Sequence, residues 1–166
     1  MERTRPPSFV EIADQDARQA FIGGNPEVVS WLPPGTKLCK WTDSIFRDDG
    51  SVTPWWLFVE SRQLANGATC PSLSDRQAWA GRLGVHERVY TRVRAGVTRQ
   101  WNSMERLVAI ELILGAWGYI GKSSGQLEDK TVANVYLIGG EYQVWIPGLT
   151  RDGVREMHLV PQKPKR

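Results

Sequence analysis

The chain has 166 residues, of which 41% are hydrophobic and 23% are charged, with a net charge of +3 and a pI near 9.0. No apolar run approaches the roughly 18 residues that a membrane-spanning helix needs, and the opening MERTRPPSFVEI lacks the apolar stretch of a signal peptide. We therefore expect no membrane partner, and either a cytoplasmic location or export by a route without a classical signal peptide.

The cysteine and histidine content excludes two further classes of protein. Two cysteines, Cys39 and Cys70, are too few for a disulfide scaffold, and two histidines, His86 and His158, exclude a multi-histidine metal site. We expect no metal. The length is typical of one domain, which we place over residues 1–166, with loose tails at 1–8 and 161–166.

The first third of the chain predicts a helix followed by a strand. Residues 9–21 (FVEIADQDARQAF) have apolar side chains at helical spacing, and Gly23-Gly24 ends that pattern. After Asn25-Pro26, residues 27–32 predict a short helical turn. Residues 36–41 (TKLCKW) then predict a strand. Its two-residue period places Leu38 and Lys40 on one face and the alternate residues on the other face: Lys37, Cys39 and Trp41.

The middle of the chain predicts an aromatic strand, a loop and two helices. Residues 51–60 contain VTPWWLFVE, in which Pro54 indicates an edge or a bulge. The second helix, over 85–101, has four valines at steps of four: Val85, Val89, Val93 and Val97. We expect these to be buried and its arginines to be solvated: Arg88, Arg92, Arg94 and Arg99. Those arginines, together with exposed tryptophans, could alternatively contact a nucleic acid.

The last third of the chain predicts a sheet. Residues 107–114 (LVAIELIL) are typical of a strand buried on both faces, in which Glu111 needs an arginine or lysine partner. A second strand follows at 116–122, and 154–160 predicts an edge strand. Residues 132–138 and 141–147 flank Gly139-Gly140 and predict an antiparallel hairpin. With helices early and strands late, the fold class is α+β, with N-terminal helices and a mostly antiparallel sheet.

Three segments are unusual for a purely structural role, although no standard catalytic signature such as a P-loop, GxSxG or HExxH is present. The first is PPGTKLCKWT, the second GSVTPWW and the third GGEYQVWIP. Adjacent strand residues point to opposite faces, so one of Trp55 and Trp56 should face the core. Glu141 and Gln143 share a face with Trp145, which is typical of a half-exposed sheet or of the lining of a pocket.

In their order along the chain, these segments resemble the ADP-ribosyltransferase-like toxin and effector domains, in particular the NAD-consuming domains of the tuberculosis necrotizing toxin type. The matching residues are LPPGTKLCKW at 32–41, then Thr53, Pro54, Trp55 and Trp56, then Gly139, Gly140, Glu141, Tyr142 and Gln143. The resemblance implies an ADP-ribosyltransferase-like fold and NAD as a substrate. It further implies cleavage of the nicotinamide–ribose bond, by an NAD glycohydrolase or an ADP-ribosyltransferase.

The resemblance also assigns a role to each matching residue. Lys40 binds the pyrophosphate, or Lys37 does so if the strand faces the other way. Trp55 or Trp56 stacks on the nicotinamide ring. Thr53 places its hydroxyl beside the ribose, Gln143 contacts the ribose, and Glu141 assists or orients an acceptor. Besides NAD, the implied partners are an acceptor macromolecule or an immunity protein.

Two departures from the family pattern leave alternatives open. The family commonly has arginine or histidine where Lys40 stands, and lysine lacks the bidentate fork of arginine. Gln143 in place of a glutamate suits NAD hydrolysis better than transfer to a protein. A catalytically silent interaction module, immunity-like or structural, would keep the same residues, and nucleic-acid binding is the third alternative.

Overall fold

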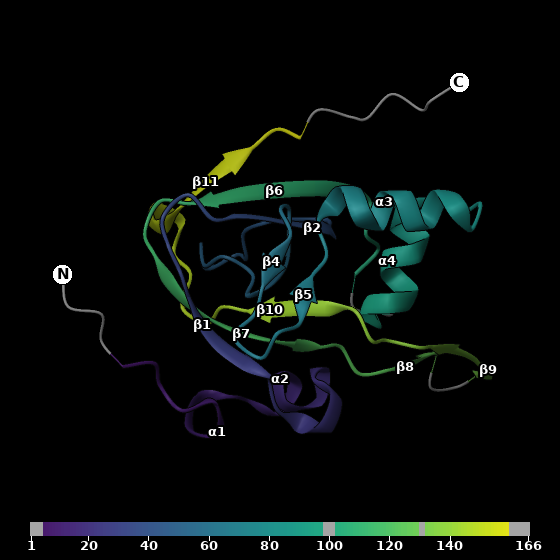
Figure 1. Cartoon of the computed structure of the whole chain (residues 1–166), viewed down its shortest axis with the longest axis horizontal. Coiled ribbons are helices and arrows are strands. Elements are labelled where there is room, and N and C mark those ends of the chain that lie inside the picture. The colour runs from purple at the N-terminus through teal and green to yellow at the C-terminus, as the bar shows by residue number, and fades with distance from the viewer. Residues whose placement is uncertain (1–4, 98–101, 130–131, 160–166) are drawn as a thin grey trace.

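The computed structural model describes residues 5–97, 102–129 and 132–159 (Figure 1). Residues 1–4 and 161–166 of the predicted tails lie outside these ranges, as does Arg99. The helices are α1 (Phe9–Ile12), α2 (Gln15–Ala20), α3 (Leu73–Arg82) and α4 (Glu87–Ala95), with 3-10 turns η1 (Ile22–Gly24) and η2 (Arg151–Gly153). The strands are β1 (Val28–Leu32), β2 (Lys37–Thr42), β3 (Trp55–Phe58), β4 (Arg62–Gln63), β5 (Thr69–Cys70), β6 (Arg106–Leu112), β7 (Ala116–Lys122), β8 (Gln126–Asp129), β9 (Val132–Leu137), β10 (Tyr142–Trp145) and β11 (Val154–Met157).

Seven of the strands form one sheet, in the order β1-β7-β10-β3-β2-β6-β11, and each neighbouring pair is antiparallel. Two small hairpins, β4–β5 and β8–β9, stand outside this sheet. The prediction of an α+β protein with a mostly antiparallel sheet is therefore confirmed. Within the described ranges, no helix is both long and apolar enough to cross a bilayer.

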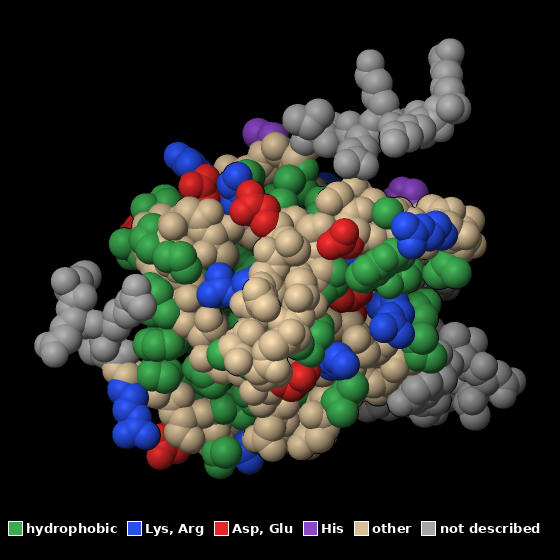
Figure 2. Space-filling model, in the orientation of Figure 1, with side chains coloured by type: hydrophobic (Ala, Val, Ile, Leu, Met, Phe, Trp, Pro, Cys, Tyr) green, Lys and Arg blue, Asp and Glu red, His purple; other side chains and the backbone are tan. Residues whose placement is uncertain are grey.

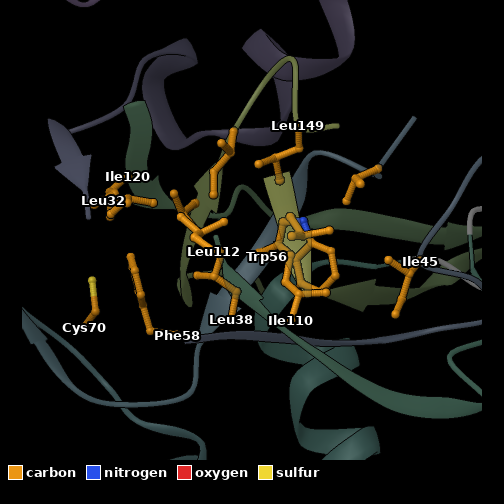
Figure 3. Close-up of a cluster of buried hydrophobic side chains, with 14 of the residues drawn as sticks. Leu32, Leu38, Ile45, Trp56, Phe58, Cys70, Ile110, Leu112, Ile120 and Leu149 are labelled. Carbon is orange, nitrogen blue, oxygen red and sulfur yellow. The ribbon is translucent and has the colours of Figure 1, made fainter. Parts of the chain in front are cut away.

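The sheet bends over its own apolar face. In Figure 1, β2 and β6 run along one side while β7 and β10 run along the other, and the β4–β5 hairpin lies between them. The side chains that fill this space come from both sides: Leu38 and Ile110 from β2 and β6, and Ile120 from β7, belong to one buried cluster (Figure 3). We expect this cluster to dominate stability, since each fully buried aliphatic side chain contributes roughly 1.5–3 kcal/mol.

Two smaller apolar clusters cover the outer face of the sheet. The N-terminal helices place Phe9, Ala17 and Phe21 against Tyr119 and Trp145. On β2 and its neighbours, α3 packs Leu73 against three side chains: Cys39, Leu57 and Ala109. Cys39 is thus a small buried residue of the strand, and burial raises the pKa of its thiol to about 11. Both cysteines are free.

The N-terminal prediction is correct in part. The helix predicted over 9–21 is two short helices, because Asp14 leaves helical geometry and caps α2, its Oδ1 accepting a hydrogen bond from the Ala17 amide at 2.7 Å. The helical turn predicted over 27–32 is wrong. These residues form β1, which pairs with β7 over five positions from Val28 to Leu32. Pairing along a whole strand outweighs a weak local helical preference.

The predicted hairpin around Gly139-Gly140 is also wrong. β9 pairs with β8, while β10 lies between β7 and β3 in the main sheet. Gly139 (φ 68°) and Gly140 (φ 87°) adopt left-handed backbone conformations that carry the chain from the small hairpin into that sheet. Their amides donate to the Val93 and Ser123 carbonyls at 3.0 and 2.7 Å. The glycine pair does separate two strands, but a break between strands does not specify which strands pair with each other.

The predicted burial of the four valines is wrong, because Val93 and Val97 are only half-buried and the first two are exposed. Val85 and Val89 are 39% and 46% exposed, whereas Glu87 and Thr91 are buried. The helix ends at Gly96, which has φ 65°, so the predicted continuation to residue 101 stops early. Arg88 is exposed as predicted and Arg92 is half-buried. The face of α4 that meets the sheet is therefore polar.

The expected partner of Glu111 is present. Glu111 on β6 accepts a hydrogen bond from Arg155 on β11, with 2.6 Å between Oε2 and Nη2. The two residues are direct partners in the antiparallel register. A carboxylate inside an apolar strand is thus neutralised from the edge strand, as the sequence predicted.

Candidate functional site

The three unusual segments lie on neighbouring strands. β10 pairs with β3 through Val144↔Trp56 and Trp145↔Trp55, and β3 pairs with β2 through Phe58↔Leu38 and Leu57↔Cys39. Residues about a hundred positions apart therefore meet in the middle of the sheet. β2 follows the Pro-Gly turn, β3 follows Thr53-Pro54, and β10 follows Gly139-Gly140.

A cavity of about 80 Å³ opens where β2 and β3 separate. Their pairing stops at Cys39↔Leu57, so Lys40 and Trp41 are not bonded to the β3 residues that would continue the ladder. Helix α4 and the segment after residue 101 complete the walls. The lining residues are Lys40, Trp41, Trp55, Trp56, Leu57, Thr91, Ala95, Val97, Asn102, Met104 and Gln143.

The adjacent tryptophans of β3 face opposite sides of the sheet, as their alternation predicts. Trp56 is buried in the main core, and its Nε1 donates to the Thr53 carbonyl at 2.6 Å. Trp55 is half-buried on the outer face, with ring centroids 5.3 Å from Phe21 and 6.2 Å from Trp145. Trp55 is thus held by other rings while it lines the cavity.

Lys40 is held at the cavity by a hydroxyl and a ring. Its Nζ donates to Thr53 Oγ1 at 2.5 Å and lies 5.0 Å from the centroid of the Trp56 ring. Burial, together with the positive charge of Arg47, lowers the pKa of Lys40 to about 7. The amine is therefore close to half-protonated at neutral pH. This contact also links Thr53, a predicted site residue, to a side chain that lines the cavity, although Thr53 is not itself part of the lining.

The choice between the two lysines of β2 is settled by the register. Lys37 points away from the cavity and pairs with Glu60, with 3.3 Å between Nζ and Oε1. Its side chain is 39% exposed. Lys40, and not Lys37, lines the cavity, so Lys37 has no contact with the other predicted site residues in the part of the chain that the structure describes.

Gln143 lines the same cavity but is tied to the N-terminal helices. It is 9% exposed, and its Nε2 donates to the Ala20 carbonyl at the end of α2, at 3.0 Å. This bond fixes the amide, with its nitrogen directed at α2. Lys40 donates to Thr53 and Gln143 to Ala20, so the two side chains share the cavity without a bond between them.

Glu141 lies near the cavity but is not part of its lining. The side chain is 4% exposed, and its Oε1 accepts a hydrogen bond from the Tyr142 amide at 3.2 Å. Burial raises the pKa of Glu141, and the charges of Arg76 and Arg94 partly oppose that rise. The structure therefore separates Glu141 from Gln143, although the two are only two residues apart on the chain.

Sequence reasoning did not identify the polar wall that α4 contributes. The carboxylate of Glu87 accepts hydrogen bonds from Thr91 Oγ1, at 2.5 Å, and from the Trp41 indole. Asn102 also holds Trp41 in place, since its Nδ2 donates a hydrogen bond to the Trp41 carbonyl at 3.0 Å. Glu87 and Thr91 stand four residues apart, a spacing that places them on one face of a helix. That spacing was the available signal, and the valine repeat obscured it.

A second, larger cavity of about 440 Å³ is lined, like the first, by residues of α4 and of the segment after residue 101. It is lined by Arg88, Val89, Arg92, Ser103 and Glu105. Arg92 is already engaged there, donating to the Val97 and Ser103 carbonyls at 3.1 and 2.8 Å. In the view of Figure 2, Lys and Arg side chains are spread among acidic and apolar ones, so this face has no continuous basic patch.

Two further findings concern metal sites and related proteins. In the described ranges, no group of three or more His, Cys, Asp or Glu side chains could hold a metal ion. Comparison of the chain with known proteins finds no matching family model, no matching curated protein and no matching solved structure.

Proposed function

We propose that this chain is an NAD-consuming domain with an ADP-ribosyltransferase-like fold, which cleaves the nicotinamide–ribose bond. One observation supports this proposal most. Lys40, Trp55, Trp56 and Gln143, drawn from three separate segments, line one cavity on three adjacent strands, and Thr53 is bonded to Lys40 there. These are the residues to which the toxin-domain resemblance assigns NAD contacts.

The proposed chemistry uses the aromatic wall and the amide. Positive charge develops on the ribose as nicotinamide leaves, and a fixed polar group beside the sugar stabilises that state. Gln143 would hold a ribose hydroxyl, and Trp55 would stack on the nicotinamide ring. We propose water as the acceptor, because Glu141 is buried outside the cavity lining and is not placed to orient a protein acceptor.

Binding of NAD requires the cavity to widen. An apolar cavity of roughly 150 Å³ accommodates a benzene ring, about twice the 80 Å³ found here. Met104 is the lining residue best suited to move, because an unbranched thioether repacks at little cost. The adenosine part would lie outside this cavity, and the larger one lined by Arg88 and Arg92 is adjacent.

The proposal is tested by incubating purified protein with NAD and measuring the release of free nicotinamide and ADP-ribose by chromatography. We expect both products in equal amounts, which identifies water as the acceptor. Nicotinamide without free ADP-ribose would point to transfer onto a macromolecule. Absence of both binding and turnover at millimolar NAD would overturn the proposal.

A second candidate is a catalytically silent interaction module, and an exposed apolar surface favours it. Four large apolar side chains on α3, on α4 and between them are at least one-third exposed: Trp79, Leu83, Val85 and Val89. Figure 2 shows hydrophobic side chains gathered over the α3–α4 end of the molecule. Contiguous apolar surface of this kind is typical of protein–protein contact. A protein that forms a stable complex through this surface and leaves NAD unchanged would establish this alternative.

A further inference from the structure

Lys40 differs from an ordinary surface lysine in its surroundings. Its amine contacts a hydroxyl and the face of an indole, with no carboxylate among the described residues that line the cavity. It is also the only ionisable side chain among them. Four other lining residues supply an apolar wall: Trp41, Trp55, Leu57 and Met104. An amine in an apolar recess without an acidic partner is the usual environment of a nucleophilic lysine.

We propose that Lys40 forms an imine with a small aldehyde or ketone that enters this cavity. A cavity of about 80 Å³ admits a carbonyl compound of roughly two to four carbon atoms as it stands, whereas a substituted aromatic ring enters only after the cavity widens. The apolar lining favours an uncharged compound over a carboxylate-bearing one. This activity does not depend on NAD cleavage.

The reaction balances without a further reactant. The Nζ lone pair forms a bond to the carbonyl carbon while the carbonyl π electrons move to the oxygen. A proton passes from nitrogen to that oxygen and gives a carbinolamine. The remaining N–H proton then passes to the hydroxyl group, which leaves as water with its C–O electron pair, and the electrons of the N–H bond form the C=N bond of the neutral imine. Thr53 Oγ1, 2.5 Å from Nζ, is placed to relay the proton between nitrogen and oxygen.

The protonation state of the amine is consistent with this role. With a pKa of about 7, because of burial and the charge of Arg47, Lys40 has a large neutral fraction at pH 7.5. An ordinary lysine, with a pKa near 10.4, has about one amine in a thousand unprotonated at that pH. Lys37 on the same strand is 39% exposed and paired with Glu60, and it provides a matched internal control.

The test is reductive trapping of the folded wild-type protein at pH 7.5 with propanal and cyanoborohydride. Peptide mass spectrometry then gives the rate of propyl labelling at each lysine. We expect Lys40 to be labelled at least about tenfold faster than Lys37, and this preference to disappear in denaturant. Equal or slower labelling of Lys40 in the folded protein would overturn the proposal.

Two further measurements distinguish a selective binding site for carbonyl compounds from general reactivity of the Lys40 amine. Pyridoxal carries a substituted ring that enters only if Met104 moves aside, so relative to Lys37 it should label Lys40 far more slowly than propanal does. Thr53→Val should slow the trapping at Lys40 several-fold and leave Lys37 unchanged. If pyridoxal labels Lys40 as readily as propanal does, the cavity does not select the carbonyl compound and the proposal is wrong. Neither measurement involves NAD, so the outcome is independent of the NAD test.

Discussion

Lys40 on β2 and Thr53, just before β3, form a hydrogen bond of 2.5 Å between Nζ and Oγ1 at the point where the two strands separate. The bond joins an amine whose pKa is lowered by burial to a hydroxyl that cannot neutralise its charge. Lys40 is therefore a site where the fold loses stability when the amine is protonated. The cost of holding this charge in the fold can be measured.

Replacing Lys40 by methionine should stabilise the protein, and more at low pH. The folded pKa of about 7 lies below the ordinary lysine value of 10.5. The destabilisation is therefore complete below pH 7 and shrinks as the pH rises towards 10.5. We expect Lys40→Met to increase the free energy of unfolding by about 2–4 kcal/mol at pH 6 and by less at pH 9. Urea unfolding at both pH values measures this, with Lys37→Met as the control that should change little. An equal gain in the free energy of unfolding at both pH values would contradict the lowered pKa of Lys40.

Replacing Glu87 by alanine should loosen the wall that α4 contributes to the cavity. The change removes the acceptor of Thr91 and of the Trp41 indole, two donors that are left buried or partly buried. We expect a loss of about 2–4 kcal/mol in stability. The exposed Glu60→Ala should cost less than about 0.5 kcal/mol. Thermal unfolding of both variants provides the comparison, and similar losses would show that Glu87 has no special structural role.

Replacing Gly139 by alanine should disrupt the passage into β10. A Cβ at this position would lie 2.6 Å from the Ser123 carbonyl oxygen, in a backbone conformation with φ 68°. Gly35 has φ 89° but nothing within 4 Å of its Cβ position, so it isolates the conformational cost alone. We expect Gly35→Ala to cost about 1–2 kcal/mol and Gly139→Ala to cost clearly more. Equal losses of stability in the two variants would mean that the backbone at Ser123 shifts at little energetic cost, contrary to this prediction.

The sequence predicted the strands better than their partners. Alternation placed Leu38 and Lys40 on one face of β2 and separated Trp55 from Trp56, because side-chain direction in a strand is a local property. The pairing of β10 with β7 and β3 is set by the whole sheet, and the Gly139-Gly140 turn carries no information about it. The hairpin prediction was wrong for this reason.

The error on α4 has a related cause. Valines at steps of four indicate a buried apolar stripe in a typical amphipathic helix. Here the helix packs against a polar surface, where the Trp41 indole N–H requires a hydrogen-bond acceptor. Glu87 and Thr91 therefore face inward, and Val89 is exposed. The candidate cavity is consequently lined by Thr91 and Ala95, which are not part of the valine repeat, as well as by Val97. Which face of a helix is buried depends on its partner as well as on its own sequence.

Replacing Met104 by alanine should widen the cavity. Met104 is 1% exposed and lines it, so the truncation removes apolar volume at a cost of about 2–5 kcal/mol in stability. If NAD must displace this side chain, the variant should have a several-fold lower KM for NAD at a temperature where it remains folded. A KM that is unchanged or higher in the folded variant would contradict the proposed route of nicotinamide entry.

The central claim is that Gln143 holds the ribose of NAD for cleavage, and the most direct measurement is the rate of nicotinamide release by wild type and Gln143→Ala. Removing a polar group that stabilises a developing charge costs about a hundredfold or more in kcat, whereas loss of the Ala20 hydrogen bond should cost only about 1–2 kcal/mol in stability. We therefore predict turnover in the wild type, a hundredfold fall in Gln143→Ala at a similar folded fraction, and full activity in Lys37→Ala. A Gln143→Ala protein that is folded and as active as the wild type would contradict the account.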